Sequence, residues 1–186
     1  MKDLSNKKVA ILATNGFEES ELREPKRALE EANATVHIVS PENGSIKSWD
    51  KDDWGQSYNV DITLDQANVN DYDGLVLPGG VINPDTLRQN SDAVNFVRSF
   101  FQAHKPVAAI CHAPQLLTEA GVVEGRRMTS YNSIKTDLQN AGANWVDEEV
   151  VVDSGLVTSR NPDDLPAFNA KVIEEIKEGK HAGQVV

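Results

Sequence analysis

Short apolar runs alternate with amphipathic segments along most of this chain. The runs have the length and composition of strands that are buried on both faces of a parallel sheet, and they cover residues 8–13, 34–39, 73–77 and 106–110. The segments between and after them carry apolar residues at helical spacing, which predicts helices over residues 19–32, 92–103, 113–120, 133–140 and 165–177. Repeated strand–helix units are typical of a sheet covered by helices.

Two segments depart from this alternation. Residues 150–152 and 156–158 predict a β-hairpin, which would add an antiparallel strand to the sheet. The polar stretch of residues 41–58, which holds Trp49 and Trp54, is expected to be irregular.

The order of the elements predicts one α/β domain over residues 1–186, with a core of about 8–178. We expect a flavodoxin-like three-layer sandwich, in which a mainly parallel sheet has helices on both faces. Pro25 disfavours a helix interior, so the first helix either starts near Glu24 or is kinked. The last helix is expected to give way to a frayed tail from Gly179.

Composition narrows the classes of partner. Of the 186 residues, 39% are hydrophobic and 25% are charged, which is ordinary for a globular protein, and we expect no membrane association. The net charge of −11 repels phosphate backbones and predicts no nucleic-acid binding. A single cysteine forms no internal disulfide, and the N-terminus has no apolar signal region, so we expect a cytoplasmic protein.

That single cysteine, Cys111, lies between an apolar run and a predicted helix. A cysteine at such a tight strand-to-helix turn resembles the nucleophile elbow of hydrolases, with sulfur in place of oxygen. The positive end of the helix dipole favours the thiolate there. The alternative is a small buried hydrophobic residue, which is what most free cysteines are.

Neighbouring residues could support such a thiol. His112 is the candidate base, although a histidine in a polar turn is often only a surface group. Glu21 follows the first strand and could reach the same sheet edge, because sites in parallel sheets form at the carboxyl ends of strands. Gly79 and Gly80 could let backbone N–H groups approach an oxyanion, or could simply permit a tight turn.

Two further expectations concern the role of Asp85 and the presence of a metal or cofactor. Asp85 is expected to cap a short helix that begins near Thr86. The histidines, cysteine and carboxylates show no recognised metal spacing, and the chain has no phosphate-binding glycine motif, so we expect no metal and no cofactor.

Five segments in order resemble the PfpI family of intracellular cysteine peptidase-like, deglycase and general stress proteins, in the class I glutamine amidotransferase-like superfamily. The resemblance runs from about Lys8 to Ile176, and it rests on the segments GFEESEL (16–22), LVLPGG (75–80), PVAAICH (106–112), GRRMTSY (125–131) and VVVD (150–153).

The resemblance implies a nucleophilic thiol at Cys111, with His112 as its partner and Glu21 as a buried acid beside the sulfur. It also implies a homodimer or larger assembly, in which an acidic residue of a neighbouring subunit completes the triad. Asp85 matches that position, where peptidase-like members carry glutamate. Ala113 departs from the glycine that is usual after the histidine.

Two classes of function follow from these residues. In the first, Cys111 attacks the carbonyl carbon of methylglyoxal, of a glycated adduct or of a peptide bond. In the second, the protein is a redox-sensing or holdase stress protein, in which Cys111 is oxidised and Glu21 stabilises the product. An inactive interaction module is a third reading.

Overall fold

A seven-stranded sheet forms the centre of the computed structural model, which describes residues 3–184 and residue 186. All neighbouring strands in this sheet are parallel except the first pair. From edge to edge the strands are β11 (Val151–Asp153), β12 (Leu156–Ser159), β8 (Val107–Ile110), β7 (Gly74–Leu77), β1 (Lys8–Leu12), β3 (Thr35–Ser40) and β6 (Ile62–Thr63).

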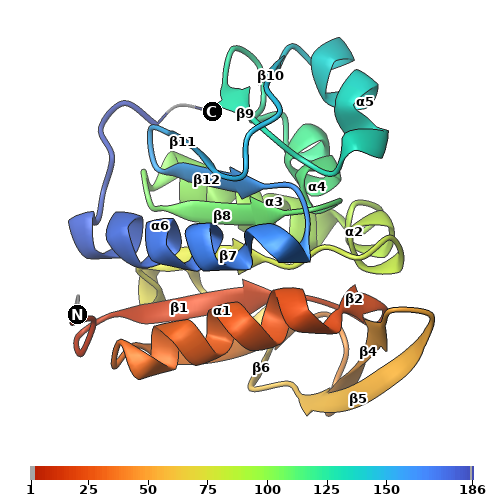
Figure 1. Ribbon diagram of the computed structural model, residues 1–186. Coiled ribbons are helices and arrows are strands. Elements are labelled where there is room, and N and C mark those ends of the chain that lie inside the picture. Colours follow the sequence, from red (N-terminus) through yellow and green to blue (C-terminus); the bar gives the residue numbers. More distant parts are fainter. Residues whose placement is uncertain (1–2, 185) are drawn as a thin grey trace.

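Helices cover both faces of this sheet, as Figure 1 shows. One face carries α1 (Glu19–Glu31) and α6 (Leu165–Glu178), and the other carries α3 (Ser91–Gln102) and α4 (Pro114–Glu119). The expected flavodoxin-like three-layer sandwich is therefore confirmed. The remaining helical segments are short: α2 (Ile82–Leu87), α5 (Lys135–Asn140), and the 3-10 turns η1 (Leu64–Gln66), η2 (Val69–Asp71), η3 (Asn132–Ile134) and η4 (Pro162–Asp164).

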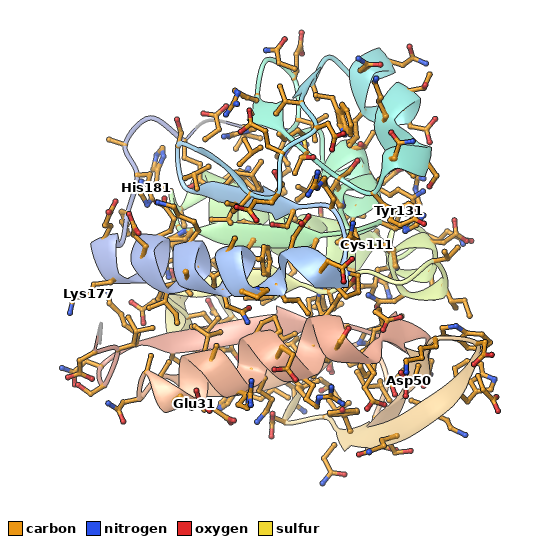
Figure 2. All side chains as sticks on the ribbon, in the orientation of Figure 1. Glu31, Asp50, Cys111, Tyr131, Lys177 and His181 are labelled. Carbon is orange, nitrogen blue, oxygen red and sulfur yellow. The ribbon has the colours of Figure 1, made fainter. Side chains whose placement is uncertain are left out.

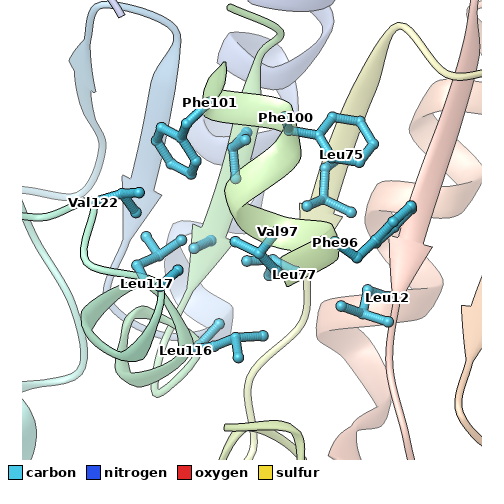
Figure 3. Close-up of a cluster of buried hydrophobic side chains, with 14 of the residues drawn as sticks. Leu12, Leu75, Leu77, Phe96, Val97, Phe100, Phe101, Leu116, Leu117 and Val122 are labelled. Carbon is cyan, nitrogen blue, oxygen red and sulfur yellow. The ribbon is translucent and has the colours of Figure 1, made fainter. Parts of the chain in front are cut away.

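Alternate residues of each central strand pack into two separate cores. In β1, Ala10 and Leu12 join the core beneath α3, whereas Val9 and Ile11 join the core beneath α1 and α6. Figure 3 shows the first of these cores, where Phe100 and Phe101 of α3 lie over the sheet. Because both faces are buried, the strands read as continuous apolar runs rather than as alternating ones.

The polar stretch 41–58 is not irregular, and this expectation was wrong. It forms a β-hairpin of β4 (Ser45–Asp50) and β5 (Asp53–Asn59), beside which β2 (Phe17–Glu18) pairs with β4. The buried side chain of Ser48 donates a hydrogen bond of 2.6 Å to Glu19 of α1. A buried polar contact thus joins the hairpin to α1, and Ile46 of β4 is buried in the core beneath α1 and α6. A further pair of strands is β9 (Arg127–Met128) with β10 (Asn144–Trp145).

Two local expectations need correction, and one open alternative is excluded. The helix α1 begins at Glu19 as predicted and holds Pro25 inside, which excludes a helix start near Glu24. Asp85 does not cap a helix, because α2 begins at Ile82 and holds Asp85 in its interior. The segment after Gly179 is not frayed throughout, since Gln184 is fully buried and its carbonyl oxygen lies 2.7 Å from His104 Nδ1.

The hairpin of β11 and β12 is confirmed, with Val152 opposite Val157. None of the helices in the described part of the chain is long and apolar enough to cross a membrane. The expected single domain over 1–186 stays a prediction.

Candidate active site

Cys111 lies at the carboxyl end of β8, directly before α4, as the strand-to-helix pattern predicts. Its backbone has φ = +64°, in the left-handed region that non-glycine residues rarely adopt. Such a conformation costs about 1–2 kcal/mol. Two backbone hydrogen bonds hold it: Cys111 N donates to the Ser159 carbonyl over 3.1 Å, and Tyr131 N donates to the Cys111 carbonyl over 2.8 Å. The turn is therefore a strained elbow.

The imidazole of His112 lies against the sulfur. His112 Nδ1 is 3.1 Å from Cys111 Sγ, and the ring stacks on Tyr131 with 4.7 Å between ring centroids. Figure 2 shows Cys111 and Tyr131 at the same end of the molecule. Burial lowers the pKa of His112, so its ring is neutral at neutral pH and can accept a proton.

Glu21 of α1 is fully buried beside the turn that follows β7. Its Oε2 accepts a hydrogen bond of 2.8 Å from Gly79 N. Its Oε1 is buried and has no hydrogen-bond partner within normal distance among the described residues. Burial raises the pKa of Glu21 to about 8, and the nearby charge of Glu18 acts in the same direction. At neutral pH the carboxyl group therefore holds its proton for most of the time.

The pKa of the Cys111 thiol is raised, whereas the sequence pattern predicts a favoured thiolate. Burial, and after it the charge of Glu21, raise the pKa of Cys111, while the backbone N–H groups of Gly80 and His112 lower it. Protonation of Glu21 removes its repulsion, so the acid and the thiol titrate as a pair.

Gly79 and Gly80 lie where the Cβ atom of any other residue would clash with neighbouring atoms. A Cβ atom on Gly79 would lie 2.5 Å from Glu21 Oε2 and 2.7 Å from Cys111 Cβ. Gly80 has φ = +78°, and a Cβ atom there would lie 2.7 Å from the Gly16 carbonyl oxygen. This arrangement is compatible with both interpretations of the glycines, the tight turn and the approach of backbone N–H groups. The turn is tight, and the backbone N–H of Gly80 lowers the pKa of the Cys111 thiol. The Gly79 N–H already has Glu21 as its acceptor.

Asp85 lies apart from this cluster within the chain. Its side chain is exposed on α2, and among the described residues no hydrogen bond joins it to His112. The role that the family resemblance implies for it requires a second subunit, so that role stays a prediction.

Two residues at the site carry no signal in the sequence pattern. Ser133 Oγ lies 3.0 Å from His112 Nε2. Asn83 is fully buried, accepts a hydrogen bond of 2.8 Å from Thr14 N, and donates to the Pro78 carbonyl over 2.9 Å. Asn83 thereby links the loop after β1 to the turn after β7. Only the tertiary contacts distinguish these two residues from other polar residues in turns.

In the part of the chain that the structure describes, potential metal ligands meet away from this site, at Glu175, Glu178 and His181. His181 Nε2 contacts Glu175 Oε2 at 3.1 Å.

Curated relatives share most of this chain. Deglycase PH1704 of Pyrococcus horikoshii is 46% identical over 91% of this chain and 99% of its own length. General stress protein 18 of Bacillus subtilis is 45% identical over 88% of this chain and 94% of its own length. Putative cysteine protease YraA of the same organism is 40% identical over 92% of this chain and 99% of its own length.

Solved structures agree in fold. A two-domain protein of Anabaena variabilis, with DJ-1/ThiJ/PfpI-like and ferritin-like domains, matches 97% of this chain with a TM-score of 0.86 and 34% identity. The match covers 50% of the length of that protein. DJ-1beta of Drosophila melanogaster matches 92% of this chain and 94% of its own, with a TM-score of 0.82 and 29% identity.

The site is thus a cysteine–histidine pair on a strand-to-helix elbow of a three-layer α/β sandwich. The model of the DJ-1/PfpI family matches residues 7–175, and the chain belongs to this family. The expected resemblance is confirmed.

Proposed function

We propose that the protein is a stress-protective, cysteine-dependent enzyme of the PfpI type, in which Cys111 attacks the carbonyl carbon of methylglyoxal or of a glycated adduct. The observation that carries this proposal is the 3.1 Å contact between Cys111 Sγ and His112 Nδ1 on a strained elbow. The names of the relatives, which include deglycase, cysteine protease and general stress protein, support the same class and leave proteolysis as a further activity within it.

The chemistry begins with a proton transfer. His112 Nδ1 takes the thiol proton, and the thiolate adds to the carbonyl carbon, which forms a C–S bond and leaves negative charge on the former carbonyl oxygen. Protonated Glu21 limits charge repulsion next to the thiolate. The N–H of Gly80, with that of Gly79 when Glu21 releases it, stabilises the oxyanion, which then takes the proton back from His112. For turnover, a proton moves from the former aldehyde carbon to the neighbouring carbon, which leaves a lactoyl thioester, and water then cleaves the C–S bond and releases lactate and the Cys111 thiol.

Purified wild type, Cys111→Ser and Glu21→Gln test this proposal. Each protein is incubated with methylglyoxal under phosphine reduction, and NMR follows its consumption and identifies the product. We expect many turnovers in wild type and none in Cys111→Ser. Consumption that stops at one equivalent per thiol would contradict catalysis of this substrate.

One observation favours the second candidate, a redox sensor. Among the described residues, Glu21 Oε1 is buried with no partner at normal hydrogen-bond distance, while the Glu21 carboxyl group interacts with the Cys111 thiol, so a protonated carboxyl group can donate to an oxidised sulfur. Two molecules of peroxide would each transfer one oxygen atom to Cys111 and release water, which gives first the sulfenic and then the sulfinic acid. Intact-mass spectra after peroxide treatment distinguish this single conversion from turnover.

The proposal includes a homodimer or larger assembly and a cytoplasmic location. A second subunit would give Asp85 a place at the site, and a reducing compartment would keep Cys111 free. Light scattering measures the first of these properties directly.

A further inference from the structure

The two ring nitrogens of His112 have different partners in the same chain. Nδ1 lies 3.1 Å from Cys111 Sγ, and Nε2 lies 3.0 Å from Ser133 Oγ. A neutral imidazole has one donor nitrogen and one acceptor nitrogen, so the partner of Nε2 decides what Nδ1 can do. A hydroxyl can accept from Nε2–H, which leaves Nδ1 bare toward the thiol.

We propose that Ser133 is a positioning residue, whose hydroxyl accepts a hydrogen bond from Nε2–H of His112 and orients Nδ1 toward Cys111. This inference rests on the proposed function, in which His112 is the base for the thiol. Nε2 keeps its hydrogen when Nδ1 takes the thiol proton, so the Ser133 hydroxyl accepts the bond in both protonation states. The proton therefore moves between sulfur and Nδ1 without any change at Ser133.

The backbone around Ser133 is anchored to the elbow. Tyr131 N donates to the Cys111 carbonyl over 2.8 Å, and Ile134 N donates to the Tyr131 carbonyl over 3.2 Å. Ile134 is buried, so the 3-10 turn that carries Ser133 is held on both sides of that residue. The Ser133 side chain itself is exposed, so these contacts fix the backbone position from which its hydroxyl reaches His112 Nε2.

Within one chain, Ser133 Oγ is the hydrogen-bond partner of His112 Nε2. A neutral hydroxyl orients the ring without adding a negative charge, so the imidazolium gains less than it would from Asp85 of a second subunit. The other titratable groups that contact the ring within the described residues are Cys111 and Tyr131. The structure thus gives one chain its own orienting group.

The test measures the His112 titration by NMR in the full chain without substrate. Because an acceptor on Nε2–H stabilises the imidazolium, Ser133→Ala is expected to lower the pKa of His112. Ser133→Thr, which keeps the hydroxyl, restores the wild-type value, and Ser133→Asp raises it. Thr136→Ala removes an exposed hydroxyl from the next helical turn, and we expect it to match wild type.

A second measurement is the rate at which iodoacetamide alkylates Cys111. Loss of one orienting hydrogen bond is expected to slow alkylation of Ser133→Ala by about two- to tenfold at neutral pH, with rescue in Ser133→Thr. A His112 titration and a Cys111 alkylation rate in Ser133→Ala that both match wild type would overturn the inference. If wild type fails to turn over methylglyoxal while these shifts occur, the proposed function fails and the role of Ser133 stands.

Discussion

His112 Nδ1 lies 3.1 Å from the Sγ of the residue that precedes it, Cys111. Adjacent side chains in a regular strand point to opposite faces of the sheet and do not meet in this way. The contact forms because φ = +64° at Cys111 turns the chain back on itself. The strained backbone and the reactive pair are therefore one feature, as is common at functional sites.

Replacement of His112 by alanine removes the nearest base from the thiol. We expect turnover of methylglyoxal to fall by about 10²- to 10⁴-fold, which is the usual contribution of a general base. Steady-state kinetics measures the loss, and His37→Asn, on β3, is the control for an unrelated histidine. Full activity in His112→Ala would exclude His112 as the base.

Glu21 makes stability depend on pH. Its pKa is raised to about 8 by burial, so the folded state holds this proton more tightly than the unfolded state does. The contribution to the free energy of unfolding is complete below the ordinary glutamate pKa, and it is lost as pH rises through the window up to about 8. Its size is on the order of a few kcal/mol.

Urea unfolding of wild type and Glu21→Gln across that window measures this contribution. His37 and His112 have lowered pKa values and titrate in the opposite sense, so the difference between the two proteins isolates Glu21. We expect wild type to lose stability relative to Glu21→Gln as pH rises. Parallel stability curves would show that Glu21 is ionised in the folded state.

Gly79→Ala is expected to damage both fold and site. The new Cβ atom would lie 2.5 Å from Glu21 Oε2 and 2.7 Å from the Ile110 carbonyl oxygen. Overpacking of this kind costs about 1–3 kcal/mol. Gly183→Ala is a matched control, because its Cβ atom would lie 3.6 Å from its nearest neighbour, Ser154 Oγ. Thermal unfolding and the alkylation rate of Cys111 should both change in Gly79→Ala and not in the control.

Glu19 connects α1 to the hairpin of β4 and β5. Its Oε2 accepts from Ser48 Oγ over 2.6 Å and from Gln56 N over 3.0 Å. Glu19→Ala removes the acceptor of Gln56 N, whereas Ser48 Oγ still lies 3.1 Å from the Gln56 carbonyl oxygen, and the change is expected to cost about 1–3 kcal/mol. It should also speed proteolytic cleavage in the exposed turn at Lys51. Glu30→Ala, which removes an exposed carboxylate from the same helix, should change neither measurement, since surface ion pairs contribute little.

The amino-acid sequence by itself determined the α/β class, the central parallel strands and the position of Cys111 on an elbow. These features depend on local periodicity, on runs buried on both faces, and on one residue between a strand and a helix. Such signals lie within a few neighbouring residues, and so they can be read along the chain.

Tertiary structure decided the rest. A buried contact between Ser48 and Glu19, 29 residues apart, joins the β4–β5 hairpin to α1. Ser133 reaches His112 from 21 residues away. The raised pKa of Glu21 comes from burial by segments distant in sequence. Hydrogen bonding and desolvation of polar groups depend on which segments meet, and apolar periodicity does not encode those contacts.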